Sequence, residues 1–343
     1  MRGQAGLKHK GALWAAWLTA GALLAGCGPA APAGFVLIPT TVLEATATAS
    51  ALPTATATQT STATATQTLE PSPVPPTASA SATATHTVEP TATGSPTLVP
   101  SPTLGPTPDA EAHLRVVTAP ILMYHYVEPW PPGPDDLRQG LTVRPEDFAA
   151  QMAYLHAQGY VTVSLYDLVE ALAVGKPLPE KPIVITFDDG YRSLMDFALP
   201  ELQRYGYTAT VFVITQLMDE GFPQYLTWEQ AQSLYALGWK VEPHTKTHDQ
   251  LGGRGRDFQL YQMLGSLQTV EAHIGVTPRF LAYPSGAYDD LSVELAKELH
   301  LWGAATVNYA RVHTYGSLHE MGRVRVSGLG TLEEFVAALG DGP

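Results

Sequence analysis

The stretch Ile183-Val184-Ile185-Thr186-Phe187-Asp188-Asp189-Gly190 decides the fold, because an apolar, β-branched run ends abruptly in two carboxylates and a glycine. Such a run predicts a buried strand that leads into a turn. Two adjacent carboxylates repel each other and lose hydration there unless something compensates. A divalent cation would compensate, with one carboxylate as its ligand and the other free as a base. A solvated Asp-Asp-Gly turn is the simpler alternative.

A second strand end carries imidazoles. The strand expected at Trp239–Glu242 leads into Pro243-His244-Thr245-Lys246-Thr247-His248. Two His four residues apart can face one ion if the segment turns helically. With one Asp they make a three-ligand set with open positions, as in catalytic metal sites. Glu242 is a reserve ligand, and a pair of surface His is the alternative.

Further strands and helices alternate on both sides of these two segments. The strands are expected at 121–124, 161–163, 183–187, 209–214, 239–242, 279–283, 304–307 and 324–326. Repeated strand–helix units favour a parallel sheet, and we expect an α/β fold, a distorted (β/α) barrel of seven or eight strands. In a barrel, functional groups gather where strands lead into helices.

Helix boundaries support this alternation. Pro145 suits a first helical position, and Gly159 ends that helix. Thr227 with Gln230 and Thr331 with Glu334 form capping-box patterns. Residues 256–274 should form a helix that places Leu260, Leu264, Leu267 and Val270 along a stripe, and the last helix should bury Phe335 and Leu339.

A third strand end reads Tyr283-Pro284-Ser285-Gly286. Its Pro and Gly allow a tight loop whose backbone N–H groups could serve as oxyanion donors. An ordinary exit from a strand into a turn has the same composition.

Together these segments resemble the polysaccharide deacetylases, the NodB-homology domain of carbohydrate esterase family 4. Thr186-Phe187-Asp188-Asp189-Gly190 matches the first family motif, His244 to His248 the second, and Tyr283-Pro284-Ser285-Gly286 the Tyr-Pro variant of the third. The Met123-Tyr124-His125 element is similar to the poly-N-acetylglucosamine deacetylase branch. The resemblance extends from Pro120 to the final helix.

The resemblance implies a role for each matched residue. Asp188 would be the general base, while Asp189, His244 and His248 would bind a divalent metal, with Zn²⁺ as the first choice. The backbone near Tyr283 and Ser285 would stabilise the oxyanion.

The general acid implied by the resemblance is His125, with a structural His as the alternative. His313 and His319 do not match the late Leu-x-His element of the family. Ala282 stands where many members have an Arg that pairs with the base, and Arg279 is not a clear substitute. The late Asp-x-x-Asp-Trp element is not evident either.

Composition excludes other classes of protein. Lys+Arg 19 against Asp+Glu 32 gives a net charge of −13, which excludes a general nucleic-acid binder. A single Cys excludes an intrachain disulfide framework and a Cys-cluster zinc site.

The N-terminal residues resemble a bacterial lipoprotein signal peptide, predicted at 1–26. Basic residues precede an apolar run from Ala12 to Ala25, and Gly26 is followed by Cys27, the only thiol. Acylation of Cys27 would anchor the mature protein outside the cytoplasmic membrane. An ordinary secretory signal with an accidental Cys is the alternative.

Residues 27–112 are expected to be a disordered tether, because Thr, Ala, Pro and Ser dominate and large apolar residues are scarce. Residues 113–343 are then the catalytic domain.

The sequence therefore predicts a lipid-anchored, metal-dependent hydrolase that removes N-acetyl groups from a cell-surface or cell-wall polysaccharide containing N-acetylglucosamine. The polysaccharide and the membrane are its expected partners, without nucleic acid or a protein partner. Two alternatives stay open: an esterase acting on O-acetyl xylan, and a non-catalytic glycan-binding lipoprotein. Trp130 is either a sugar-stacking residue or a loop anchor.

Overall fold

The structure, a computed structural model, describes residues 105–341. The predicted signal peptide, Cys27 and most of the predicted tether lie outside this part. The first described residues already contact the domain: the Asp109 N–H donates to the Ala173 carbonyl at 3.0 Å, and the Asp109 carboxylate pairs with Arg115. These contacts begin shortly before the predicted domain start at 113. Among the described helices, none is both long and apolar enough to cross a bilayer.

All eight predicted strands are present in the structure, with shifted ends. The strands are β1 (Val116–Thr118), β2 (Ile121–Tyr124), β3 (Tyr126–Val127), β4 (Thr142–Val143), β5 (Val161–Thr162), β6 (Pro182–Phe187), β7 (Thr210–Val213), β8 (Lys240–Pro243), β9 (Phe280–Ala282), β10 (Gly303–Ala305), β11 (Val312–Thr314) and β12 (Val324–Arg325). The strands β1, β3, β4 and β11 were not predicted. They are two or three residues long, too short for a periodic signal.

The strands form a parallel sheet that stops short of a closed barrel. Its order is β12-β2-β6-β7-β8, and β5 also pairs with β6. A separate two-stranded parallel sheet contains β9 and β10. Mixed α/β content is as predicted, but the described residues do not confirm the barrel, because no strand ladder joins β8 to β9.

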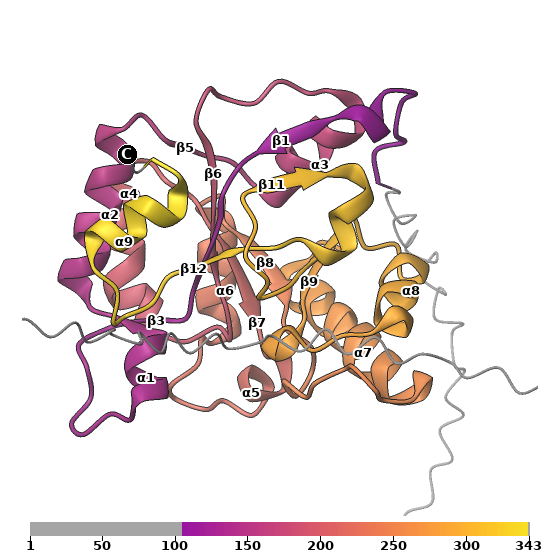
Figure 1. The fold of residues 1–343 in the computed structure, drawn as a ribbon. Coiled ribbons are helices and arrows are strands. Elements are labelled where there is room, and N and C mark those ends of the chain that lie inside the picture. The colour runs from indigo at the N-terminus through magenta and orange to yellow at the C-terminus, as the bar shows by residue number, and fades with distance from the viewer. Residues whose placement is uncertain (1–104, 342–343) are drawn as a thin grey trace, which may run out of the picture. The chain divides into compact units, whose positions relative to one another are not determined.

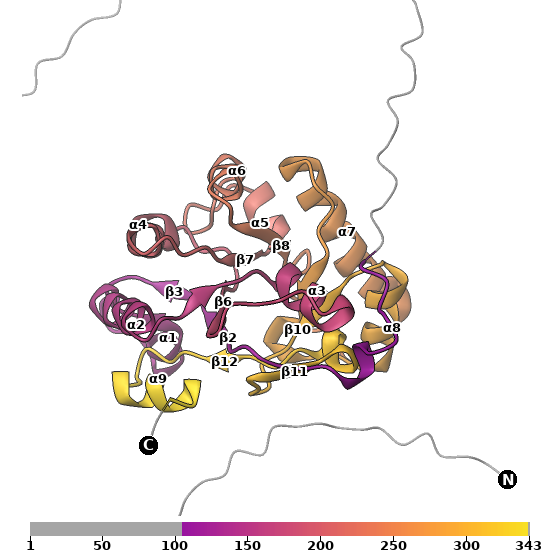
Figure 2. The same ribbon diagram turned by 90° about the horizontal axis from the view of Figure 1, so that it is seen from above.

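Helices surround the sheet (Figures 1 and 2). They are α1 (Asp136–Leu141), α2 (Pro145–Ala157), α3 (Leu165–Val174), α4 (Leu199–Arg204), α5 (Thr215–Asp219), α6 (Trp228–Ala236), α7 (Arg256–Ile274), α8 (Asp290–Glu298) and α9 (Leu332–Leu339), with short turns η1 (Ala112–Leu114), η2 (Leu194–Ala198), η3 (Pro284–Gly286) and η4 (Tyr315–Glu320). The capping boxes predicted at Thr227 and Thr331 are both confirmed.

The helix predicted at 256–274 is confirmed as α7, and its apolar stripe makes up only part of the buried face. Leu267 and Val270 are buried, but Leu260 and Leu264 are half-buried, and Gln259, Gln262 and Ser266 take part in the buried face instead. The buried glutamines are satisfied by hydrogen bonds, for example from Gln259 to Asp289 and from Gln262 to Thr247. A period count based only on apolar residues misses polar side chains of this kind.

The strand β6 lies at the centre of the sheet, and its side chains are therefore buried on both faces. Phe187 stacks on Tyr124 and Trp239, with ring centroids 5.5 and 5.6 Å apart. Replacing such a buried ring by Ala costs about 3–5 kcal/mol. This packing fixes the carboxyl end of β6, and with it the position of the two acidic residues that follow.

Candidate metal centre and active site

The acidic pair follows β6 directly, and both side chains are buried. Asp188 is 2% exposed and Asp189 is 5% exposed. Asp189 has a φ of +69°, and Gly190, at +77°, has Val213 so close that an added Cβ would lie 3.0 Å from its Cγ1. The strand therefore ends in a left-handed turn with close packing that favours glycine at position 190.

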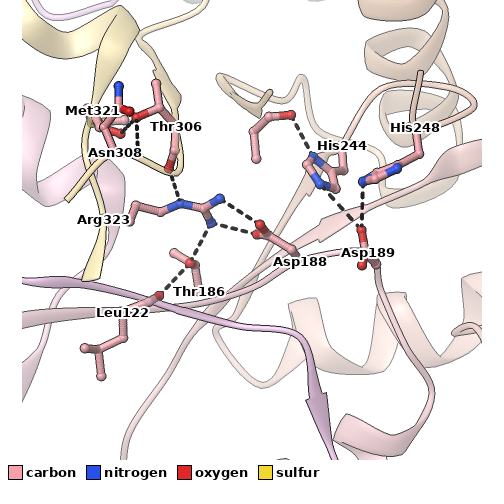
Figure 3. Close-up of polar contacts among 11 residues, drawn as sticks. Leu122, Thr186, Asp188, Asp189, His244, His248, Thr306, Asn308, Met321 and Arg323 are labelled. Atoms are coloured by element: carbon pink, nitrogen blue, oxygen red, sulfur yellow. Dashed lines mark hydrogen bonds and ion pairs between the residues drawn. The ribbon is translucent and has the colours of Figure 1, made fainter. Parts of the chain in front are cut away.

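Asp188 forms a bidentate ion pair with Arg323 (Figure 3). Both guanidinium–carboxylate distances are 2.7 Å, and Arg323 is fully buried. Arg323 also donates to the Thr186 hydroxyl at 3.0 Å and to the Thr306 carbonyl at 2.9 Å. Burial alone would raise the pKa of Asp188, but the charge and hydrogen bonds of Arg323 outweigh it and hold that pKa well below its usual range.

The two imidazoles come from the loop after β8. Thr245 and His248 have φ values of +63° and +64°, and the His248 N–H donates to the Thr245 hydroxyl at 3.1 Å. The turn directs both Nε2 atoms at Oδ1 of Asp189, at 3.5 Å from His244 and 3.3 Å from His248 (Figure 3).

This cluster fits a metal ion. The Nδ1 of His244 lies 2.7 Å from the Ala282 carbonyl, which can only accept, so Nδ1 carries the proton and Nε2 presents a lone pair. Burial lowers the pKa of His244, which favours the neutral ring that a metal requires. Oδ1 of Asp189 is buried and has no hydrogen-bond partner in the described part of the chain. The three candidate ligand atoms lie within 4.8 Å of one another, and a cation would satisfy them together.

His125 lies beside this centre, where the charges of Asp188, Arg323 and His248 all act on it. Its side chain is half-buried. Burial, helped by Arg323, Arg325 and His248, outweighs Asp188 and lowers the pKa of His125 to about 4. The ring is therefore neutral at pH 7 in the metal-free protein.

The loop after β9 offers one backbone donor. The Tyr283 N–H already donates to the Ala305 carbonyl at 3.0 Å, and Pro284 has no N–H. The Tyr283 ring is buried, its hydroxyl donates to the His319 carbonyl at 3.1 Å, and it stacks on Tyr288. Ser285 is exposed with a φ of +54°. Among Tyr283, Pro284 and Ser285, only the Ser285 N–H therefore remains as a candidate oxyanion donor.

Glu242 is not a reserve ligand, which corrects the expectation from the sequence. Its carboxylate accepts from the Arg279 and Phe280 N–H groups, both at 2.9 Å, and from the Tyr166 hydroxyl at 2.6 Å. It bridges the gap between β8 and β9, where the strand ladder is missing. Burial raises the pKa of Glu242 to about 7.

Sequence analysis missed Arg323, which supplies the guanidinium that was sought at position 282. Arg323 precedes β12, about 40 residues after Ala282 along the chain, so only the fold brings it to Asp188. The one signal in the sequence was that Arg323 directly precedes the strand predicted at 324–326. Arg279 does not take this place, since Arg323 occupies both oxygens of Asp188.

Other candidate residues have structural contacts. A ring nitrogen of His313 lies 3.1 Å from the Ala119 carbonyl, and one of His319 lies 3.0 Å from the Leu301 carbonyl. Trp130 donates from Nε1 to the Thr142 carbonyl at 3.1 Å, which anchors its loop.

Comparison with known proteins identifies the class. The polysaccharide deacetylase family matches residues 175–303. YxkH of Bacillus subtilis strain 168, whose name assigns it to the polysaccharide deacetylases, is 30% identical over 208 residues, which cover 61% of this chain and 71% of YxkH. The chain belongs to the polysaccharide deacetylase family.

Two further proteins relate the chain to particular members. The poly-β-1,6-N-acetyl-D-glucosamine N-deacetylase of Staphylococcus epidermidis is 26% identical over 200 residues, covering 54% of this chain and 68% of that protein. The solved structure of the Streptococcus pyogenes deacetylase PplD in complex with acetate has a TM-score of 0.61 and 27% identity, covering 66% of this chain and 99% of that one. The chain is thus a polysaccharide deacetylase related to poly-N-acetylglucosamine deacetylases.

Proposed function

We propose that the protein is a metal-dependent hydrolase that removes N-acetyl groups from a cell-surface or cell-wall polysaccharide containing N-acetylglucosamine. One observation carries the metal dependence. Oδ1 of Asp189, which has no hydrogen-bond partner in the described part of the chain, faces the Nε2 atoms of His244 and His248. Nε2 of His244 is unprotonated and presents its lone pair. The Asp189 oxygen and the His244 lone pair are two buried acceptors that face each other, and they repel unless a cation lies between them.

Asp189, His244 and His248 would hold the ion, and Zn²⁺ suits one carboxylate and two imidazoles with open positions. When bound, the ion supplies Lewis-acid chemistry that polarises the acetamide carbonyl and activates water.

The chain's own groups would manage the protons. Asp188 is oriented by the Arg323 fork and ionised, so it is placed to accept a proton from the attacking water. Asp188 is also the charge that most favours a protonated His125. We assign to His125, whose ring is neutral at rest, the transfer to the leaving amine of the proton that Asp188 accepts from the attacking water, and to the Ser285 N–H a hydrogen bond to the oxyanion.

Relatives named as poly-β-1,6-N-acetyl-D-glucosamine N-deacetylases support an N-acetyl substrate over O-acetyl xylan. A glycan-binding protein without catalysis would have no need for a convergent ligand set, which favours the enzyme.

For location, we propose that Cys27 is acylated and that the segment up to residue 112 tethers the domain outside the cytoplasmic membrane. The signal-like residues before Cys27 support this. Incorporation of labelled palmitate into the expressed full chain, lost in Cys27→Ser, tests the anchor. Label retained in that variant would exclude it.

Acetate release tests the activity. We expect release from poly-N-acetylglucosamine, peptidoglycan or chitin oligomers, little from acetylxylan, and loss of release with a chelator. His244→Ala should abolish release, whereas His113→Ala, which changes an exposed His outside the centre, should not. Equal release by His244→Ala would reject the metal role.

A further inference from the structure

A groove begins on the loop that carries the two imidazoles and follows helix α7. Its volume is about 800 Å³, within the range of small-molecule sites. Its lining includes Lys246, Leu260, Tyr261, Leu264, Gly265 and Gln268. None of these residues has a part in the centre described above.

The groove is close to the reacting centre along the chain. Lys246 lies midway between His244 and His248, so its Cα is at most about 7.6 Å from each of theirs. Gln262 of α7 holds this loop: its Oε1 accepts from the Lys246 and Thr247 N–H groups at 3.1 and 3.0 Å, and its Nε2 donates to the Thr247 hydroxyl at 2.6 Å. The helix that supports the imidazole loop thus also lines the groove.

The lining has the chemistry of a sugar-binding surface. Tyr261 is 55% exposed, and the Lys246 ammonium lies 6.0 Å from the centroid of its ring. Leu260 and Leu264 are half-buried apolar neighbours, while Gln268 is exposed and offers an amide. An aromatic face with polar groups at its edge matches a pyranose, which has an apolar face and hydroxyls around it.

Space for a ring comes from Gly265. A Cβ at this position would make ordinary contact with Cδ of Lys246 at 3.5 Å, so a long side chain such as Leu would extend into the groove that Gly265 lines. The charges of the lining are mixed, since it includes Lys246, Asp219 and Asp257, and this gives no net attraction for a polyanion.

We propose that this groove is a subsite that binds neighbouring hexosamine units of the polysaccharide, next to the unit whose acetyl group is removed. The proposal rests on the proposed function and specifies its substrate as a chain rather than a single sugar. Sugars bound there would contact the loop of His244 and His248 through Lys246.

Kinetics on N-acetylglucosamine and its oligomers of two to six units test the proposal. We expect kcat/KM to rise with chain length. Tyr261→Ala should raise KM for the hexamer about 3- to 10-fold, with kcat for the hexamer and kcat/KM for the single sugar unchanged. Gly265→Leu should act similarly by filling the groove. Tyr309→Ala, another exposed tyrosine that lies outside this lining, is the matched control and should leave the length dependence intact.

Binding separates this proposal from the proposed function. In Asp189→Asn protein, which should not consume the ligand, the hexamer should perturb the NMR signals of Tyr261 and Gly265. Acetate release without length dependence, or with a dependence that both groove variants leave unchanged, would overturn the subsite and leave the function standing. An equal loss for the single sugar and the hexamer would also overturn it, since the variants would then act through the loop. Hexamer binding at Tyr261 without acetate release from any oligomer would support the subsite and reject the activity.

Discussion

Asp188 and Asp189 are adjacent in the sequence and both are buried, yet their surroundings are opposite. Asp188 receives two hydrogen bonds from one guanidinium, and both of its oxygens are occupied. Asp189 faces two imidazoles and keeps an oxygen without a partner in the described part of the chain. The protein thus neutralises one carboxylate itself, and in the proposed function the other is neutralised by a bound cation. The predictions below test this difference.

The largest effect is expected from Asp189→Asn. We expect kcat/KM for acetate release to fall by more than about 100-fold, since even outer partners of a metal ligand can contribute that much. Metal analysis should show loss of the bound ion. The metal-free variant should unfold no more readily than the metal-free parent, because a neutral amide replaces an unpartnered buried charge.

Asp196→Asn is the matched control, since Asp196 is exposed and lies on the same loop-to-helix segment. It should keep its metal and its activity. Stoichiometric metal in Asp189→Asn would show that Asp189 is not a ligand.

The second effect concerns the other carboxylate. Arg323→Met removes one partner of a buried ion pair and should lower the free energy of unfolding by about 3–5 kcal/mol, measured by urea denaturation. Arg325→Met changes an exposed residue two positions further on, in β12, and should stay within about 0.5 kcal/mol. Adding Asp188→Asn to Arg323→Met should recover part of the loss. If the single variant loses less than about 1 kcal/mol, water has replaced the guanidinium and the pair is not the main support of Asp188.

The two carboxylates also differ in how much of their surroundings the sequence reveals. The partners of Asp189 lie in a short motif, His244 to His248, so residue types and spacing were enough to predict them. Arg323 is brought to Asp188 only by the pairing of β12 with β2 and of β2 with β6, and no local pattern encodes that contact. The prediction of Glu242 as a reserve metal ligand was wrong for the same reason, because its partners are backbone N–H groups of a distant segment.

The fold shows a similar division. Long apolar runs and capping boxes predicted the main strands and the helices α2, α6, α7 and α9, because these signals are local. The barrel was not confirmed, since closure depends on whether β8 and β9 pair edge to edge, and side-chain periodicity carries no information on that.

The third prediction concerns His125, whose pKa responds to the charges of both Asp188 and His248. Its pKa of about 4 is below the 6.5 of the unfolded chain, so the folded protein binds fewer protons between these values. The free energy of unfolding of the metal-free protein should therefore decrease as pH falls from about 6.5 to 4, by at most about 3 kcal/mol from this group. An NMR titration should give a midpoint near 4, and Arg325→Met should raise it, because a nearby positive charge is removed. A midpoint near 6.5 would contradict the burial and charge balance described here.

The smallest effect is expected from Glu242→Gln, which tests a buried carboxylate whose partners are dipoles rather than a guanidinium or a cation. The pKa of Glu242 is raised to about 7 from 4.5, so the folded protein holds the extra proton in this window, and the free energy of unfolding should decrease as pH rises through it. The amide that replaces the carboxyl group in the variant cannot ionise, so this decrease should be absent. At pH 5 the variant should differ from the parent by about 1 kcal/mol or less, since one hydrogen bond is rearranged, and at pH 8 it should be equally or more stable. Taking the difference between the variant and the parent cancels the opposite contribution of His125. An identical pH dependence in both proteins would mean that Glu242 is already ionised at pH 5, and that the backbone N–H groups of Arg279 and Phe280 stabilise its charge as fully as Arg323 stabilises that of Asp188.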